Sequence, residues 1–307
     1  MKLFPFRSKL IVLLYHRIAR ETSDPWSLCV TPEHFVEHLQ VLQNFRRVPL
    51  SWLDPSGYPL FGDPEIAVSF DDGYSDNLTV AAPLLRLYDT PATFFIATGY
   101  IGATGEYWWD ELERIVFEGA PLPSSLTGIT EGRTFSRQVP PDQNRAETYT
   151  FLYEQLQPLS DDTRRVLLGR LADECWPVPE ARPSRRPMAL DELRTLAAEQ
   201  LFEIGAHTVR HPLLAARPVG EQYREIRESK EFLERELDTP IHSFSYPYGG
   251  KQHYLPATVA AVRECGFARA CTTGGHPVKR QDGPFEMSRL NVTDMDGDAF
   301  FKFLQLS

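Results

Sequence analysis

The feature that most constrains the fold is an alternation of short apolar runs with amphipathic helical segments. Leu10–Tyr15 is a continuous apolar run, which is typical of a strand buried on both faces, and Ile66–Phe70 is the next predicted strand. Thr31-Pro32 is a typical helix start, with an N-cap and then a proline at the first helical position. A predicted helix at Asn77–Tyr88 precedes a predicted strand at Ala92–Ala97, and this order indicates a parallel sheet or barrel.

From about residue 102 to 187 the pattern changes to charged helical segments that end in a Pro/Arg-rich stretch. The alternation then resumes with Leu190–Glu199 as helix, Phe202–Ala206 as strand, Val219–Leu237 as helix, Ser243–Tyr246 as strand, Pro256–Cys265 as helix and Ala268–Thr272 as strand. We therefore expect one α/β domain over residues 1–307 with a helical insertion at about 102–187.

The net charge and the composition indicate which kinds of molecule the protein can bind. The net charge of −10 argues against a nucleic-acid partner, because such binding relies on Lys and Arg to neutralise phosphates. A hydrophobic content of 42% with 24% charged residues is ordinary for a soluble globular protein. A neutral or sugar-like substrate fits this balance better.

The N-terminus and the cysteines bear on the compartment. A basic start and an apolar run resemble a signal peptide, but that run has only about six residues and His16-Arg17 follows it in place of a cleavage site. The four cysteines form no CxxC pair, which mildly indicates a reducing compartment. We expect a cytoplasmic location, with secretion or the cell envelope as the alternative, and we find no apolar run long enough for a membrane span.

Two short motifs carry chemistry. Asp71 and Asp72 end a predicted strand, at the sheet edge where α/β proteins carry their binding and catalytic sites. Because successive side chains of a strand point to opposite faces, the two carboxylates are predicted to have different roles. His207 and His211 follow another strand, and their spacing places both rings on one face if that turn is helical. Each motif alone is more often a turn or a pair of packed histidines. Together they predict a metal site with one spare carboxylate.

These residues carry a resemblance to a known family. Ser69–Gly73, His207–Pro212 and Phe244–Gly249 are similar, in the same order, to three motifs of the polysaccharide deacetylase family. Its members are N- and O-deacetylases of chitin, peptidoglycan and exopolysaccharides, also grouped as carbohydrate esterase family 4-like enzymes. The resemblance runs from about Leu10 to Val292, apart from the insertion, and it implies a distorted (β/α) barrel.

The resemblance also implies a set of roles. A divalent ion, zinc in most members, would be held by Asp72, His207 and His211. Asp71 would be the general base, and the backbone N–H of Tyr248 would stabilise the oxyanion. Three protein ligands leave positions open for water and substrate, as catalytic metal sites do.

The sequence departs from the family pattern at two places. The C-terminal Leu-x-His motif that supplies the general acid in many members corresponds to Leu290-Asn291-Val292, which has no histidine. His16, directly after the first strand, is our candidate acid, and a packed or capping histidine is the alternative. Ser245 stands where the family commonly has an arginine that pairs with the base, and Arg289 is the candidate substitute, an ordinary structural arginine being the alternative.

Aromatic residues near the motifs are candidates for the walls of a sugar site. They are Tyr246, Tyr248 and Trp108, with core packing as the alternative. The favoured function is a metal-dependent hydrolase that removes N-acetyl, or O-acetyl, groups from a sugar or polysaccharide. Two alternatives stay open: a non-catalytic glycan-binding relative, and a hydrolase of non-sugar C–N bonds on the same fold. The oligomeric state is not predicted.

Overall fold

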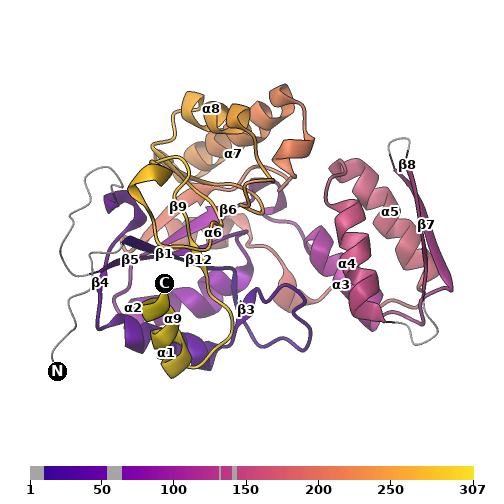
Figure 1. Ribbon diagram of the computed structural model, residues 1–307, viewed down its shortest axis with the longest axis horizontal. Helices are drawn as coiled ribbons and strands as arrows, with labels where there is room; N and C mark the ends of the chain where they lie inside the picture. The colour runs from indigo at the N-terminus through magenta and orange to yellow at the C-terminus, as the bar shows by residue number, and fades with distance from the viewer. Residues whose placement is uncertain (1–9, 54–63, 131–132, 140–143) are drawn as a thin grey trace. The chain divides into compact units, whose positions relative to one another are not determined.

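The computed structural model describes residues 10–53, 64–130, 133–139 and 144–307 (Figure 1). The chain divides into two compact units, which we describe separately. The first comprises Met1–Ile101 and Met188–Ser307, and the second comprises Gly102–Pro187. The second unit has the same bounds as the expected insertion.

The first unit is built on a curled eight-stranded sheet in which the strands pair in parallel. The order is β11-β10-β9-β6-β5-β1-β12, and β4 pairs with β5. The strands are β1 (Leu10–Tyr15), β4 (Arg46–Arg47), β5 (Glu65–Phe70), β6 (Ala92–Ile96), β9 (Phe202–Ala206), β10 (Ser243–Ser245), β11 (Arg269–Cys271) and β12 (Leu290–Asn291). The predicted parallel sheet is confirmed.

A single late segment links the two edges of this sheet. Met287 forms a parallel bridge with Cys271 of β11, and the carbonyl of Met287 accepts from the N–H of Thr272 at 2.8 Å. A few residues later, β12 pairs with Leu13 and Leu14 of β1. This segment connects edge strand β11 to β1 and so closes the curled sheet, which gives the distorted (β/α) barrel that was expected.

Helices cover the outer face of the sheet (Figure 1). They are α1 (Pro32–Leu42), α2 (Ala82–Leu87), α6 (Leu190–Ala197), α7 (Val219–Leu237), α8 (Pro256–Glu264) and α9 (Gly297–Leu306). Helix α1 begins as predicted, since Thr31 Oγ1 accepts from the N–H of His34 and Pro32 is the first helical residue. Among the described residues, no helix combines the length and the apolar character that crossing a membrane requires.

Side chains along the strands alternate between two apolar clusters. In β1, Ile11 and Leu13 pack beneath the helices, whereas Leu10 and Val12 join a smaller cluster with residues of β6 and β11 on the concave face. Ala67 belongs to the concave cluster, so Ser69 and then Asp71, at intervals of two, continue the same face. The concave face thus becomes polar at the carboxyl ends of the strands.

The second unit contains more than the predicted helices. Its helices are α3 (Trp108–Glu118), α4 (Arg145–Leu156) and α5 (Asp161–Glu174). Between α3 and α4, an antiparallel hairpin pairs β7 (Ser125–Thr130) with β8 (Arg133–Gln138). The purely helical expectation was therefore wrong, because the charged helices on either side obscured a short run rich in β-branched Thr and Ile.

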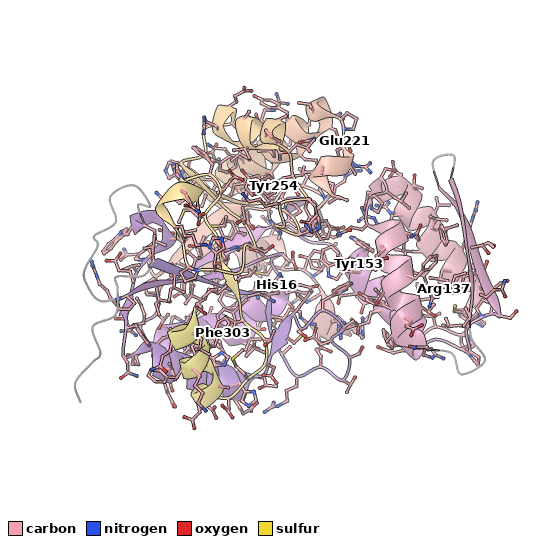
Figure 2. The ribbon with its side chains drawn as sticks, viewed as in Figure 1. His16, Arg137, Tyr153, Glu221, Tyr254 and Phe303 are labelled. Carbon is pink, nitrogen blue, oxygen red and sulfur yellow. The ribbon has the colours of Figure 1, made fainter. Side chains whose placement is uncertain are left out.

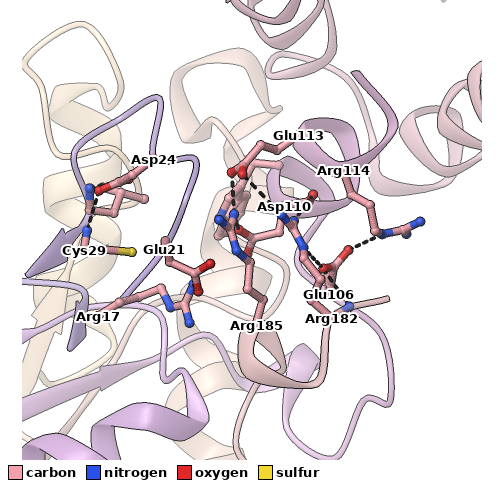
Figure 3. Close-up of polar contacts among 12 residues, drawn as sticks. Arg17, Glu21, Asp24, Cys29, Glu106, Asp110, Glu113, Arg114, Arg182 and Arg185 are labelled. Carbon is pink, nitrogen blue, oxygen red and sulfur yellow. Dashed lines mark hydrogen bonds and ion pairs between the residues drawn. The ribbon is translucent and has the colours of Figure 1, made fainter. Parts of the chain in front are cut away.

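Ion pairs fasten the entry of the second unit to its exit (Figure 3). Arg182 Nε lies 2.6 Å from Glu106 Oε1, and its Nη1 lies 3.2 Å from Glu113 Oε1. Arg185 Nη1 lies 2.9 Å from Asp110 Oδ1 and also contacts Glu113. These carboxylates are nearly buried, so the pairs are shielded from solvent and hold the two ends of the insertion together.

A buried histidine predicts how the stability of the first unit depends on pH. His38 of α1 stacks on Phe300 of α9, its Nε2 lies 2.7 Å from the Met295 carbonyl, and its Nδ1 lies 3.2 Å from Tyr15 Oη. Burial lowers the pKa of His38 to about 4. Since an unfolded histidine titrates near ~6.5, the unfolded state binds the proton first, and stability falls as the pH drops from ~6.5 to about 4.

Replacing the histidine removes this contribution. In His38→Gln, the slope of the unfolding free energy with pH should decrease by up to about 1.4 kcal/mol per pH unit in that interval. The slope is measured by urea denaturation at a series of pH values. Val262→Ala, in the buried face of α8, keeps the histidine and its stacking partner and should keep the wild-type slope. Equal slopes in His38→Gln and wild type would contradict the prediction.

Candidate metal centre

Three buried side chains meet at the carboxyl ends of β5 and β9. Asp72 Oδ1 lies 3.6 Å from Nε2 of His207 and 3.6 Å from Nε2 of His211. The ligand atoms of all three lie within 4.8 Å of one another. These separations exceed a hydrogen bond and are close to the roughly 3.4 Å between neighbouring ligands of a tetrahedral ion with bonds of about 2.1 Å. One carboxylate and two imidazoles therefore fit a divalent ion such as zinc.

The turn that carries the two histidines is not helical, so the condition for a shared helical face is not met. Thr208 and His211 have left-handed backbones, with φ of 65° and 52°. Glu225 of α7 accepts from the N–H groups of Val209 at 2.9 Å and Arg210 at 2.8 Å, which holds the turn in place. The two imidazole centroids come to 4.8 Å. A tight turn held by a carboxylate brings the rings together in place of a helical face.

The orientation of His207 is set by a backbone contact. Its Nδ1 lies 2.8 Å from the carbonyl of Ser245, and because a carbonyl can only accept, Nδ1 carries the proton. Nε2 is then the lone-pair nitrogen, on the side of Asp72. Burial lowers the pKa of His207, which favours the neutral imidazole that metal binding requires.

Asp71 has a different environment from Asp72. Arg289 grips it with two parallel hydrogen bonds, Nη1 to Oδ1 at 2.7 Å and Nη2 to Oδ2 at 2.6 Å. Ser245 Oγ accepts from Arg289 Nη2 at 2.7 Å and donates to Asp71 Oδ2 at 3.1 Å. Arg289 thus stands where the substitute for the family's arginine was expected, with Ser245 as its partner.

The ion pair decides the charge of Asp71. Burial alone would raise the pKa of this carboxyl, but the Arg289 guanidinium holds it well below its usual range. Asp71 Oδ2 also lies 3.8 Å from Nε2 of His207. A carboxylate that is ionised at neutral pH therefore stands beside the three candidate ligands and is anchored separately from them.

His16 belongs to the same edge of the sheet. It is labelled in Figure 2 and follows β1, whose residue Tyr15 is paired with Phe70 just before Asp71. Its side chain is half-buried. Burial lowers the pKa of His16 to about 4, and the negative charge of Asp71 acts in the opposite direction. The imidazole is therefore within electrostatic reach of Asp71 and is neutral at neutral pH.

Tyr248 lies over the candidate ligands. Its ring is edge-on to His211 with centroids 4.6 Å apart, and its hydroxyl donates to the His211 carbonyl at 3.4 Å. Its backbone is left-handed, with φ of 62°. This half-buried residue is the one candidate aromatic from the third motif that contacts the histidine pair.

Two other predicted aromatics lie in cores and are corrected here. Tyr246 is fully buried, stacks on Tyr254 at 4.4 Å and donates its hydroxyl to the Phe285 carbonyl. Trp108 is 4% exposed and stacks on Tyr153 at 4.9 Å within the second unit. In both cases neighbouring rings take the place a sugar would need, so core packing was the correct alternative.

Two supporting residues were missed in the sequence. Ser69 Oγ accepts from Arg289 at 3.2 Å and donates to the Leu13 carbonyl at 2.8 Å. Its position two residues before Asp71 was an available signal, since both then share a face. Glu225, which holds the histidine turn, lies on a charged helix that resembles any solvated surface, and nothing in its spacing singles it out.

The buried pair predicts an asymmetric effect of mutation. Arg289→Met leaves Asp71 ionised and buried without its cation, so the free energy of unfolding should fall by about 3–5 kcal/mol in urea denaturation. Removing both charges in Asp71→Leu/Arg289→Met should restore part of that loss, because no uncompensated charge remains. A double variant less stable than Arg289→Met would contradict this account.

Comparison with known proteins yields a family match. The model of the polysaccharide deacetylase family matches residues 61–124 and 167–270, more than half of the chain. A protein of Bacillus subtilis (strain 168), "Putative polysaccharide deacetylase YxkH", is 26% identical over 144 residues. The match covers 40% of this chain and 46% of that protein, so it spans about half the relative's length.

Solved structures show the same fold. The Streptococcus pyogenes deacetylase PplD, in complex with acetate, superposes with a TM-score of 0.62 at 18% identity over 97% of this chain and 99% of its own. IcaB from Ammonifex degensii gives 0.63 at 17% identity, over 97% of each chain. Together with the family match, this fold shows that the chain belongs to the polysaccharide deacetylase family.

Proposed function

We propose that the protein is a metal-dependent hydrolase that removes N-acetyl groups from a sugar or polysaccharide, with O-acetyl groups as the alternative. One observation carries the proposal. A carboxylate that is ionised at neutral pH, Asp71, stands beside three candidate metal ligands without being one of them. A protein that only binds glycans has no need for that arrangement, whereas hydrolysis of an amide needs a proton acceptor next to an electrophilic centre.

The donor set supports zinc as the metal. Asp72, His207 and His211 would hold it, and three protein ligands leave room for water and substrate. A bound divalent ion supplies Lewis-acid activation of water and of the acetyl carbonyl.

The chain's own groups complete the reaction. Asp71 is ionised at every pH near neutrality, so its carboxylate is always available to accept a proton from the attacking water. The backbone N–H of Tyr248 would donate to the oxygen of the carbonyl as it becomes negative. His16, neutral at rest, would receive a proton during turnover and pass it to the leaving nitrogen.

The substrate class rests on the family and on chemistry. Polysaccharide deacetylases act on acetylated glycans, and the solved Streptococcus pyogenes deacetylase holds acetate, the product that such hydrolysis releases. An amine is a poor leaving group, so a site that joins a base, an oxyanion donor and a strand-end histidine suits an amide better than an activated ester.

Turnover is tested by acetate release from N-acetylglucosamine oligomers in the presence of zinc. Wild type should release acetate, and Asp71→Asn should lose at least about 100-fold in kcat because it removes the proton acceptor. Glu231→Gln, on the exposed face of α7, is the matched control and should behave as wild type. Unchanged turnover in Asp71→Asn would refute the role of the base, and release of no acetate by wild type would favour a glycan-binding role.

Metal content separates the ligands from the base. His211→Ala should lose bound zinc in elemental analysis after dialysis, because one of three ligands is removed. Asp71→Asn should retain close to one zinc per chain, because Asp71 is anchored by Arg289 outside the ligand set. Equal zinc content in His211→Ala and wild type would overturn the ligand assignment.

A further inference from the structure

The backbone around His16 is fastened residue by residue to the segment that carries Asp71 and Asp72. Tyr15, on one side, accepts at its carbonyl from the N–H of Asp71 at 3.0 Å. The carbonyl of His16 itself accepts from Asn77 Nδ2 at 2.8 Å. Arg17, on the other side, donates through Nε to Asp76 Oδ2 at 2.9 Å.

Asp76 and Asn77 act together in this contact. Asp76 Oδ1 accepts from the N–H of Ile18 at 3.2 Å and from Asn77 Nδ2 at 3.1 Å. Asn77 is fully buried and Asp76 is 6% exposed, so water does not compete for these bonds. Because both acceptors of Asn77 are oxygens that cannot donate, the orientation of its amide is determined.

Arg17 is itself fixed from several sides. It is 2% exposed, its Nη1 lies 2.8 Å from Glu21 Oε1, and its guanidinium lies 4.8 Å from the ring centroid of Tyr74. Its N–H donates to the carbonyl of Leu28. The neighbouring Asp24 accepts from the N–H groups of Leu28 and Cys29 (Figure 3), and Cys29 pairs with Arg17 in the short strand β2 (Arg17–Ile18) that follows His16.

We infer that Asp76 and Asn77 are positioning residues that hold His16 at a set distance from Asp71. This inference rests on the proposed function. A proton donor must stand within about 3 Å of the leaving nitrogen, and misplacement by about 1 Å can cost 100-fold in rate. Asp76 and Asn77 together form a clamp on the backbone of residues 16–18. Because residues 71 to 77 carry both the carboxylates and this clamp, one short stretch of chain fixes the positions of the base and the acid.

The relative rate on an amide and on an activated ester distinguishes a positioning residue from a merely structural one, because loss of structure lowers both rates alike. An acetylated amine needs a proton to leave, whereas 4-nitrophenolate leaves unaided. We therefore compare kcat on an N-acetylglucosamine oligomer with kcat on 4-nitrophenyl acetate. A variant that only loses folded protein lowers both by the same factor, and a variant with a displaced acid lowers the amide reaction selectively.

Two variants test the clamp. Asn77→Leu keeps the size of the side chain and removes the donor to the His16 carbonyl, and Asp76→Asn keeps the shape and removes the charge opposite Arg17. In each, kcat on the amide should fall by about 10- to 100-fold with KM nearly unchanged, and kcat on the ester should fall less than about threefold. His16→Gln should show the same selectivity.

Non-additivity and a matched control complete the design. In His16→Gln/Asn77→Leu the second substitution should cause no further loss on the amide, since the group that it positions is already absent. Thr258→Val removes a buried hydroxyl that contacts Gln222 and accepts from the N–H of Leu255 in the same unit. It should lower the unfolding free energy and leave both values of kcat unchanged.

The outcomes distinguish this inference from the proposed function. Equal losses on both substrates in Asn77→Leu and Asp76→Asn, no loss in either, or additive losses in the double variant would overturn the clamp while wild-type activity stands. If the ratio of kcat on the amide to kcat on the ester is unchanged in His16→Gln, His16 is not the acid, and the positioning role of Asp76 and Asn77 is refuted with it. If wild type releases no acetate from the amide, the proposed function fails and this inference fails with it.

Discussion

The buried pair of Asp71 and Arg289 is the interaction on which the first unit depends. Withdrawing two charges from water costs several kcal/mol for each ion, and the cost is offset only when nearly every donor and acceptor is used. Arg289 meets this condition with bonds to Asp71, to Ser245 at the end of β10, and through Nε to the Thr272 carbonyl just after β11 at 3.2 Å. One guanidinium therefore ties β5 to the two strands at the far edge of the sheet. Closure of the barrel and the charge of the candidate base depend on the same contact.

Much of the fold could be predicted because its strands are buried on both faces. Leu10–Tyr15 and Phe202–Ala206 have the bounds that their apolar pattern indicates, and so does the long helix Val219–Leu237. Other elements carry weaker local signals. The predicted helix at Asn77–Tyr88 begins with a π-helical turn at Asn77–Ala81, and the β7–β8 hairpin has only a short β-branched run between charged helices as its signal.

The candidate site was predictable in its members and less so in its geometry. Motif order led to Asp72, His207 and His211, which the structure brings together, and strand ends led to His16 and Arg289. The histidine turn, with its left-handed Thr208, is held at Val209 and Arg210 by a carboxylate from α7, a tertiary contact absent from the motif. The error at Tyr246 has a simpler cause. Successive side chains along a strand point to opposite faces of the sheet. Since Ser245 faces inward, Tyr246 has to face the outer core.

The ion pairs between the two ends of the insertion have a consequence for how the chain folds. The connection from β6 to α6 would otherwise be a long open loop, whose closure entropy grows with its length by about 0.6 kcal/mol for each doubling. Contacts of Arg182 with Glu106 join positions only a few residues from Ile101 and Met188. Once they form, the sheet has to close a connection of a few residues, whatever the size of the segment in between. The entropic cost of closing the long segment therefore falls on the contacts within the insertion, and strand pairing in the sheet closes only the short remainder.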